Sequence, residues 1–147
     1  PLAAARPRRV VYISPRGRFA LDTGGFMILT NDTQFAERLT NPQDHVPKTY
    51  RVSANRPLGD ADLDRLRDGM ELRDGPTRPA HVTRVSESAF EITITEGRNR
   101  QVRRMVEALD AEVVALVRIA IGSIRIGDLP SGQMRAMTEG EVKALRP

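Results

Sequence analysis

The 147-residue sequence contains no cysteine and no tryptophan, and it has only two histidines. The lack of cysteine excludes a disulfide framework, a thiolate zinc site and a cysteine nucleophile. The two histidines, His45 and His81, lie far apart in the sequence and offer no pair at metal-ligand spacing. No apolar run approaches the roughly 20 residues that a membrane-spanning helix needs. These absences indicate a water-soluble, single-domain protein of cytoplasmic character.

Lysine is also scarce, so the positive charge of the protein is almost entirely that of arginine. Lys48 and Lys143 are the two lysines, beside 21 arginines, and the net charge is +4. A guanidinium group suits phosphates and can stack on bases, although a GC-rich genome would also favour arginine. Clustering of the arginines favours a nucleic acid over a membrane as the partner. One cluster is at the start of the chain (Arg6, Arg8, Arg9, Arg16, Arg18) and the other is Arg98, Arg100, Arg103 and Arg104.

Hydrophobic periodicity predicts strands interspersed with short helices, without the regular alternation of a parallel α/β fold. The sequence therefore predicts an α+β fold with a central mixed, mostly antiparallel sheet and flanking helices. Residues 26–30 are predicted to be buried on both faces. Strands are predicted at 10–13, 26–30, 48–54, 81–85, 89–95, 113–117, 119–126 and 132–137. Helices are predicted after a cap at 31–33, at 60–68, after a cap at Asn99, and at 138–145.

Two helix ends carry strong local signals. Thr138 is followed three residues later by Glu141, which is the spacing of a capping box. Gly69 follows the predicted helix 60–68 and is expected to end it in a left-handed conformation.

The run EGRNRQVRRM at residues 96–105 is the strongest candidate for a functional motif. A glycine turn follows a strand and leads into a helix whose first turn carries several arginines. Arginines are unfavourable at this end of a helix unless a phosphate or a buried carboxylate offsets their charge. On a helical wheel Arg100 and Arg104 lie opposite the apolar stripe, whereas Arg103 flanks the stripe and can point toward a pocket. A solvated basic face is the alternative interpretation.

A second candidate is the glycine-rich run GRFALDTGG at residues 17–25. Its glycine spacing matches neither a P-loop nor a dinucleotide-binding fingerprint. Asp22 could be a turn residue as easily as a catalytic acid. Tyr50, one of two tyrosines, could likewise be a half-buried strand aromatic.

Four segments together resemble the RNA pseudouridine synthases of the RsuA/RluB type. They read GRFALDTGGFMILTND, KTYRV, FEITITEGRNRQVRRMVEAL and RIAIGSIRIGDLPSGQMRAMTEGEV, in this order, from about Val10 to Leu145. The wording EGRNRQVRRM is most similar to members that act on large-subunit rRNA. The resemblance implies a catalytic domain at residues 10–147, preceded by a linker or truncated segment at 1–9. The S4-like RNA-binding domain and first strands of such proteins are absent from this sequence.

The resemblance implies a metal-free and cofactor-free isomerisation by a cytoplasmic monomer whose partner is rRNA, with large-subunit rRNA favoured. A uridine is flipped out, its N1–C1′ bond is broken, and the base is rejoined through C5. Arg18 would assist the flipped state, Tyr50 would pack on the base and take part in proton removal, and Arg103 would pair with a catalytic aspartate. The implied RNA contacts, which position without reading sequence, are Arg18, Lys48, Arg98, Asn99, Arg100, Gln101 and Arg104.

The chain departs from this family at one decisive position. The family pattern Gly-Arg-Leu-Asp-x-x-Thr-x-Gly-Leu aligns without a gap on residues 17–26, so the catalytic aspartate falls on Ala20, and Phe19 replaces the leucine. On an extended strand Asp22 would be displaced from residue 20 by roughly 6.6 Å, too far for the placement that catalysis demands. The sequence therefore predicts impaired catalysis. An engineered substitution, a homologue that only binds rRNA, and a local shift that brings in Asp22 all remain open.

Overall fold

In a computed structural model of the protein, the structure describes residues 9–13, 24–30, 32–40, 45–98, 100–125 and 133–145. The strands are β1 (Arg9–Ile13), β2 (Gly24–Thr30), β3 (Lys48–Ala54), β4 (Glu71–Leu72), β5 (Gly75–Pro76), β6 (His81–Ser86), β7 (Ala89–Ile94), β8 (Val113–Ile121), β9 (Ile124–Arg125) and β10 (Met134–Ala136). The helices are α1 (Thr33–Thr40), α2 (Asp60–Asp68), α3 (Gln101–Glu107) and α4 (Glu139–Leu145).

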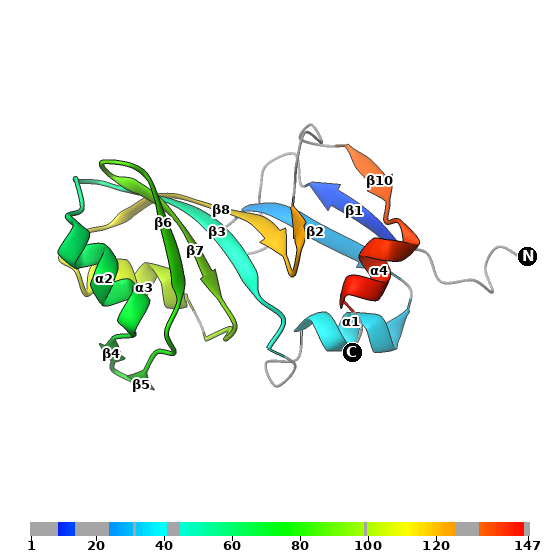
Figure 1. Ribbon diagram of the computed structural model, residues 1–147, viewed down its shortest axis with the longest axis horizontal. Helices are drawn as coiled ribbons and strands as arrows, with labels where there is room; N and C mark the ends of the chain where they lie inside the picture. Colours follow the sequence, from blue (N-terminus) through cyan, green and yellow to red (C-terminus); the bar gives the residue numbers. More distant parts are fainter. Residues whose placement is uncertain are drawn as a thin grey trace, which may run out of the picture.

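One large sheet organises the molecule. Its strands follow the order β10-β1-β2-β8-β3-β7-β6, with β9 paired to β8, and β4 pairs separately with β5. The contact between β2 and β8 is parallel, whereas the other pairings of the sheet are antiparallel. Figure 1 shows α2 and α3 beside the half that contains β6 and β7, and α1 and α4 beside the half that contains β1 and β10. The predicted α+β fold with a mixed, mostly antiparallel sheet is confirmed.

The predicted helix signals act at two of the helix starts. Asp32 Oδ1 accepts a hydrogen bond from the Phe35 amide at 3.1 Å, which caps α1. Thr138 and Glu141 form the predicted capping box at the start of α4. The Glu141 amide donates to Thr138 Oγ1 at 3.1 Å, and the Thr138 amide donates to Glu141 Oε1 at 2.9 Å.

Three local predictions were wrong. A strand break was predicted at Arg118, but β8 runs without interruption from Val113 to Ile121 and turns at Gly122, where φ is +59°. The strand at 26–30 is not buried on both faces, because Leu29 is 42% exposed. Gly69 does have a positive φ of 93°, yet its ψ of 152° lies outside the left-handed helical region.

The start of α3 also differs from the prediction. The residue at the N-cap position is Arg100, with φ 49° and ψ 34°, and its side chain makes no capping hydrogen bond. The predicted cap, Asn99, lies outside the described residues. A non-glycine residue in this left-handed region carries local strain, which is often found at functional sites.

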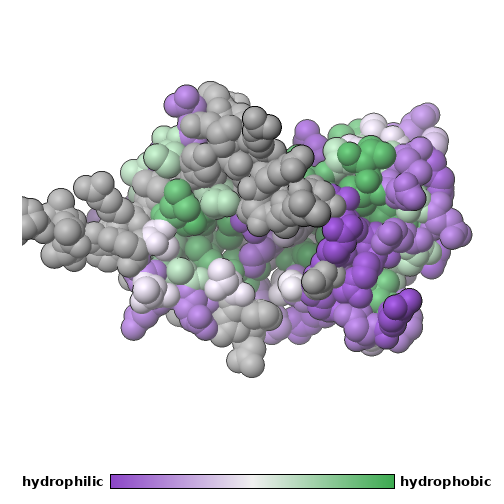
Figure 2. Space-filling view, turned by 180° about the vertical axis from the view of Figure 1, so that it is seen from behind, coloured by the Kyte–Doolittle hydropathy of each residue, from purple (hydrophilic) through white to green (hydrophobic). Residues whose placement is uncertain are grey.

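The buried side chains form two separate clusters, one for each half of the molecule. The first lies between the sheet and helices α2 and α3, and its most deeply buried members include Phe90, Ile92 and Met105. The second joins α1 and α4 to the end of β8 through Phe35 and Ile121. Seen from behind, hydrophilic side chains cover most of the lobe that carries α2 and α3 (Figure 2). None of the helices in the part of the chain described is long and apolar enough to cross a membrane.

Candidate nucleic-acid site

A row of paired residues crosses the sheet where the two halves of the molecule meet. Tyr50 on β3 pairs with Ile92 on β7 and with Arg118 on β8. Arg118 also pairs with Gly25 near the start of β2. The segment KTYRV and the end of the glycine-rich segment are therefore separated by the one strand β8. The sheet brings together two motifs that lie about 25 residues apart in the sequence.

Tyr50 and Arg118 interact directly across the strand pair. The Arg118 guanidinium donates a hydrogen bond to the Tyr50 side chain. Burial lowers the pKa of Arg118, and the interaction with Tyr50 opposes that shift. Tyr50 is half-buried and packs against the first hydrophobic cluster. One edge of its ring is therefore fixed by the core and its hydroxyl by a cation.

Lys48 lies two residues before Tyr50 on β3 and is also half-buried. Burial lowers the pKa of Lys48, and the nearby positive charge of Arg118 lowers it further. The Lys48 Nζ atom donates to the Val46 carbonyl oxygen at 3.5 Å, which is a long hydrogen bond. Two cations are thus held close together in a partly dehydrated place.

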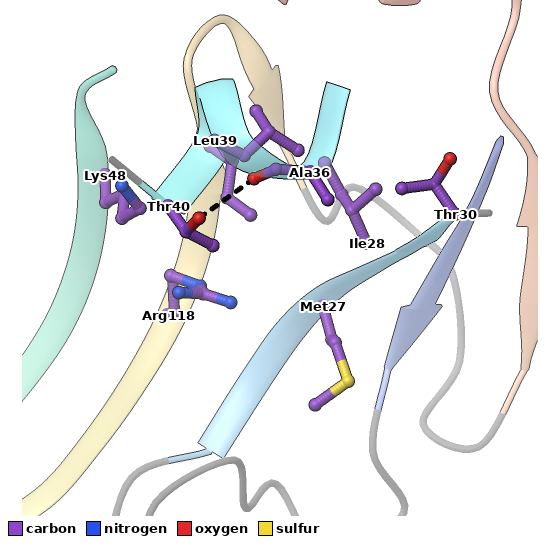
Figure 3. A pocket seen from close by; sticks show the side chains of 9 residues that line it. Met27, Ile28, Thr30, Ala36, Leu39, Thr40, Lys48 and Arg118 are labelled. Carbon is purple, nitrogen blue, oxygen red and sulfur yellow. Dashed lines mark hydrogen bonds between the residues drawn. The ribbon is translucent and has the colours of Figure 1, made fainter. Parts of the chain in front are cut away.

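A pocket of about 330 Å³ opens beside these two cations. In Figure 3, Lys48 and Arg118 lie on one side of the pocket and Met27 and Ile28 of β2 lie on the other. A register shift between Thr49 and Tyr50 skips Ile119, and this bulge allows Arg118 and Ile121 to face the same way. The lining residues are Met27, Ile28, Thr30, Ala36, Leu39, Thr40, Lys48, Arg118 and Ile121.

The arginines before and within α3 are placed in different environments. Arg100 is exposed, whereas Arg103 is half-buried on the same helix. The Arg103 Nε atom is buried and finds no hydrogen-bond acceptor among the described residues, although the side chain as a whole does interact. Arg103 therefore faces inward, as the helical wheel predicts. Its predicted pairing with an acid at position 20 stays a prediction.

Gln101 and Glu96 hold the turn that precedes α3. The Gln101 side chain is only 3% exposed, and its Nε2 atom donates to Glu96 Oε1 at 2.7 Å. The Glu96 carboxylate also accepts from the Arg78 amide at 3.2 Å. Gln101 supports the loop from inside, so we leave it out of the RNA contacts proposed below.

Arg98 and Arg104 share one carboxylate, that of Asp74 in the turn between β4 and β5. Arg98 Nη2 donates to Asp74 Oδ1 at 2.5 Å, and Arg104 Nη1 donates to the same oxygen at 2.8 Å. The two guanidinium groups hold the pKa of the Asp74 carboxyl well below its usual range. The sequence prediction made both arginines phosphate contacts, and in this structure part of their charge is already neutralised.

Replacement of Asp74 with asparagine is expected to strengthen RNA binding. The change removes one negative charge and releases two guanidinium groups for phosphates, so affinity should rise several-fold and the salt dependence should steepen by about 0.7 for each new phosphate contact. Fluorescence anisotropy of a labelled rRNA fragment at several salt concentrations measures both. The matched control is Asp64→Asn, which breaks an exposed ion pair with Arg67 on α2. Equal effects of the two variants would show that only net charge matters.

Several predicted site residues lie outside the residues that the structure describes. They are Arg18, Ala20, Asn99 and the alternative acid Asp22. The described residues contain no group of three or more histidine, cysteine, aspartate or glutamate side chains that could hold a metal ion.

Arg118 is the site residue that the sequence analysis missed. The signal was present, because Arg118 is the only charged residue of the nine in the apolar strand VVALVRIAI. A lone cation in a strand that is otherwise apolar needs a functional or structural reason. The predicted break at this position hid that signal by placing Arg118 in a loop.

Comparison with known proteins places this site in a family. The sequence profile of a family described as RNA pseudouridylate synthase matches residues 2–108. The ribosomal large subunit pseudouridine synthase E of Xanthomonas campestris is 39% identical over 150 residues, which covers 89% of this chain and 79% of that protein. The ribosomal large subunit pseudouridine synthase B of Bacillus subtilis is 39% identical, with 91% of this chain and 57% of the relative covered.

A small-subunit enzyme and a solved structure are also similar. The ribosomal small subunit pseudouridine synthase A of Escherichia coli is 36% identical, with 88% of this chain and 57% of the relative covered. The chain thus spans little more than half the length of the Bacillus and Escherichia relatives. A crystal structure of a pseudouridylate synthase superposes with a TM-score of 0.88 at 29% identity, over 96% of this chain and 74% of that one. The chain belongs to the RNA pseudouridylate synthase family, a family of isomerases.

Proposed function

We propose that this chain is the catalytic domain of an rRNA pseudouridine synthase that modifies a uridine of large-subunit rRNA. The observation that carries the proposal is the row through Tyr50, Arg118 and Gly25, which joins a half-buried aromatic ring, a buried cation and the end of the segment that carries position 20. Two of the three named relatives act, by their names, on the large ribosomal subunit. The motif EGRNRQVRRM supports the same subunit.

The reaction requires the target base to leave its stack and enter the site. Flipping costs a few kcal/mol, which contacts to the RNA backbone must offset. The flipped uracil would pack on the Tyr50 ring. The N1–C1′ bond then breaks, the base turns, and a C5–C1′ bond forms. C5 loses its proton and N1 gains one, so the product has the same composition as the substrate.

Residue 20 decides whether this chronology of bonds can run in the chain as it stands. The family's aspartate acts on the ribose or the base as a nucleophile or a proton acceptor, and the methyl group of Ala20 can do neither. Arg103, which points inward from α3, would pair with that aspartate. We therefore propose that the chain binds rRNA and that its catalysis is impaired. The alternative proposal is a homologue that only binds rRNA, and the alanine at position 20 is the observation that favours it.

The target can be identified with the variant Ala20→Asp. Unmodified fragments of large- and small-subunit rRNA are incubated with the variant, and pseudouridine is mapped chemically in each. A single modified uridine in a large-subunit fragment is the expected result. Modification confined to small-subunit fragments would overturn the choice of subunit. Tight binding of both fragments with no modification of either would favour the binding-only homologue.

A further inference from the structure

The pocket beside Lys48 and Arg118 is not accounted for by the place of the target base on Tyr50. Its volume of about 330 Å³ is at the lower end of the range for small-ligand sites, roughly 300–1,000 Å³. Four lining residues are large and apolar, namely Met27, Ile28, Leu39 and Ile121. Tyr50 is not among the lining residues. The pocket is therefore a neighbour of the Tyr50 site and has a wall of its own.

The polar groups of the pocket select for an anion. Lys48 and Arg118 are its charged lining residues within the described chain, and no carboxylate lines it there. Thr30 and Thr40 add hydroxyl groups, although the Thr40 hydroxyl also donates to the Ala36 carbonyl oxygen at 3.0 Å (Figure 3). Two cations held close together in a partly dehydrated place are costly unless a negative group joins them. An anion with an attached apolar or aromatic part fits both ends of this pocket.

The distance between the two sites matches the geometry of an RNA strand. Lys48 and Tyr50 face the same side of β3 and are separated by roughly 6.6 Å along the strand. This is comparable with the length of one nucleotide. A chain with its target base on Tyr50 would carry its next phosphate to the side of Lys48.

We propose that this pocket holds the nucleotide next to the target uridine, with its phosphodiester between Lys48 and Arg118 and its sugar or base against the apolar wall. The inference rests on the proposed function, because it takes the target base to lie on Tyr50. Arg118 then serves both sites, since it donates to Tyr50 and lines the pocket. Recognition of this neighbour would require the RNA to unstack at two successive positions.

The scarcity of lysine makes the proposal directly testable. Lys48 and Lys143 are the two lysines of the chain, and Lys143 is exposed on α4 and does not line the pocket. The full chain is labelled with a trace of an acetylating reagent, with and without an unmodified rRNA fragment, and the extent of labelling at each lysine is read by mass spectrometry. RNA is expected to protect Lys48 several-fold and to leave Lys143 unchanged. Cover and charge act in the same direction, because a bound phosphate raises the pKa of Lys48 and leaves less of the reactive free amine.

Two further measurements make the result specific. Lys48→Gln should weaken RNA binding and reduce the salt slope by about 0.7, whereas Lys143→Gln removes the same charge and should change neither. Inorganic phosphate is tested alone in the labelling assay. Protection of Lys48 by phosphate as complete as that by RNA would show a site for small anions and overturn the assignment to RNA.

The result is independent of whether pseudouridine is formed. Labelling of Lys48 that is unchanged when anisotropy shows the RNA to be bound would overturn the pocket assignment, even if the Ala20→Asp variant is active. Protection of Lys48 with no pseudouridine in any variant would retain the RNA pocket and reject the catalytic proposal.

Discussion

The Ala20→Asp variant is expected to form pseudouridine in its target rRNA on the order of 10⁴-fold or more faster than the unchanged chain, because loss of a reacting group from an enzyme costs factors of this size. A carboxylate at this position can attack the ribose or accept a proton, and a methyl group cannot. The inward-facing Arg103 would stabilise the carboxylate in its charged form. Single-turnover conversion with enzyme in excess over RNA measures the rate without a contribution from product release.

Asparagine at the same position supplies the matched control. Ala20→Asn has nearly the size and shape of the aspartate but carries no charge and no proton acceptor of comparable strength. The asparagine variant should bind RNA and remain inactive. Robust turnover by the unchanged chain would show that the catalytic position has been wrongly assigned. Asp22→Asn would then be the variant to make, and it should abolish that turnover.

Replacement of Arg103 with leucine in the active Ala20→Asp background is expected to lower kcat on the order of 10²-fold, the usual effect of removing one preorganised charged group from a site. The reason is position, because Arg103 is the half-buried arginine of α3 and its Nε atom lies in the interior. KM should change much less, since an inward-facing group contributes little to the RNA backbone contacts. Steady-state kinetics on the identified rRNA fragment separate the two constants.

Arg100 provides the comparison for this effect. It is the exposed arginine that precedes α3, and Arg100→Gln removes the same charge. This variant should raise KM and its salt dependence while kcat remains near that of the parent. If Arg103→Leu and Arg100→Gln changed kcat and KM in the same way, Arg103 would be only one more phosphate contact. Thermal unfolding of both variants checks that neither change has disturbed the packing of α3.

The parts of the fold that local sequence rules determine were predicted well. The bounds of β3 and α2 were predicted to the residue, because alternating burial and the spacing of Leu63 and Leu66 leave little freedom. The course of β8 was not predicted, since local rules treat a charged residue in an apolar run as an interruption. Only the neighbouring strands show why Arg118 stays in the strand. Tyr50 gives its guanidinium an acceptor, and Gly25 leaves open space beside it.

The site was predicted in its members more than in their arrangement. Tyr50, Arg103 and the arginine cluster stand out in the sequence because their types and spacing are unusual. Their partners do not stand out. Asp74 precedes Arg98 by 24 residues in an ordinary Asp-Gly turn, and no local rule connects the two. The pocket is equally non-local, because its walls come from α1, β2, β3 and β8.

The two hydrophobic clusters differ in how far apart along the chain their members lie. The first is complete within residues 52–116, whereas the second joins residues 35–46 to residues 121–145. Contacts between distant segments must first overcome the entropy of closing a long loop, so they tend to form late. The half with α1 and α4 is therefore expected to assemble onto a central segment that is already folded. During synthesis or refolding, the chain would display its arginine-rich helix start before it possesses the pocket, and nonspecific attraction to RNA would precede selective binding.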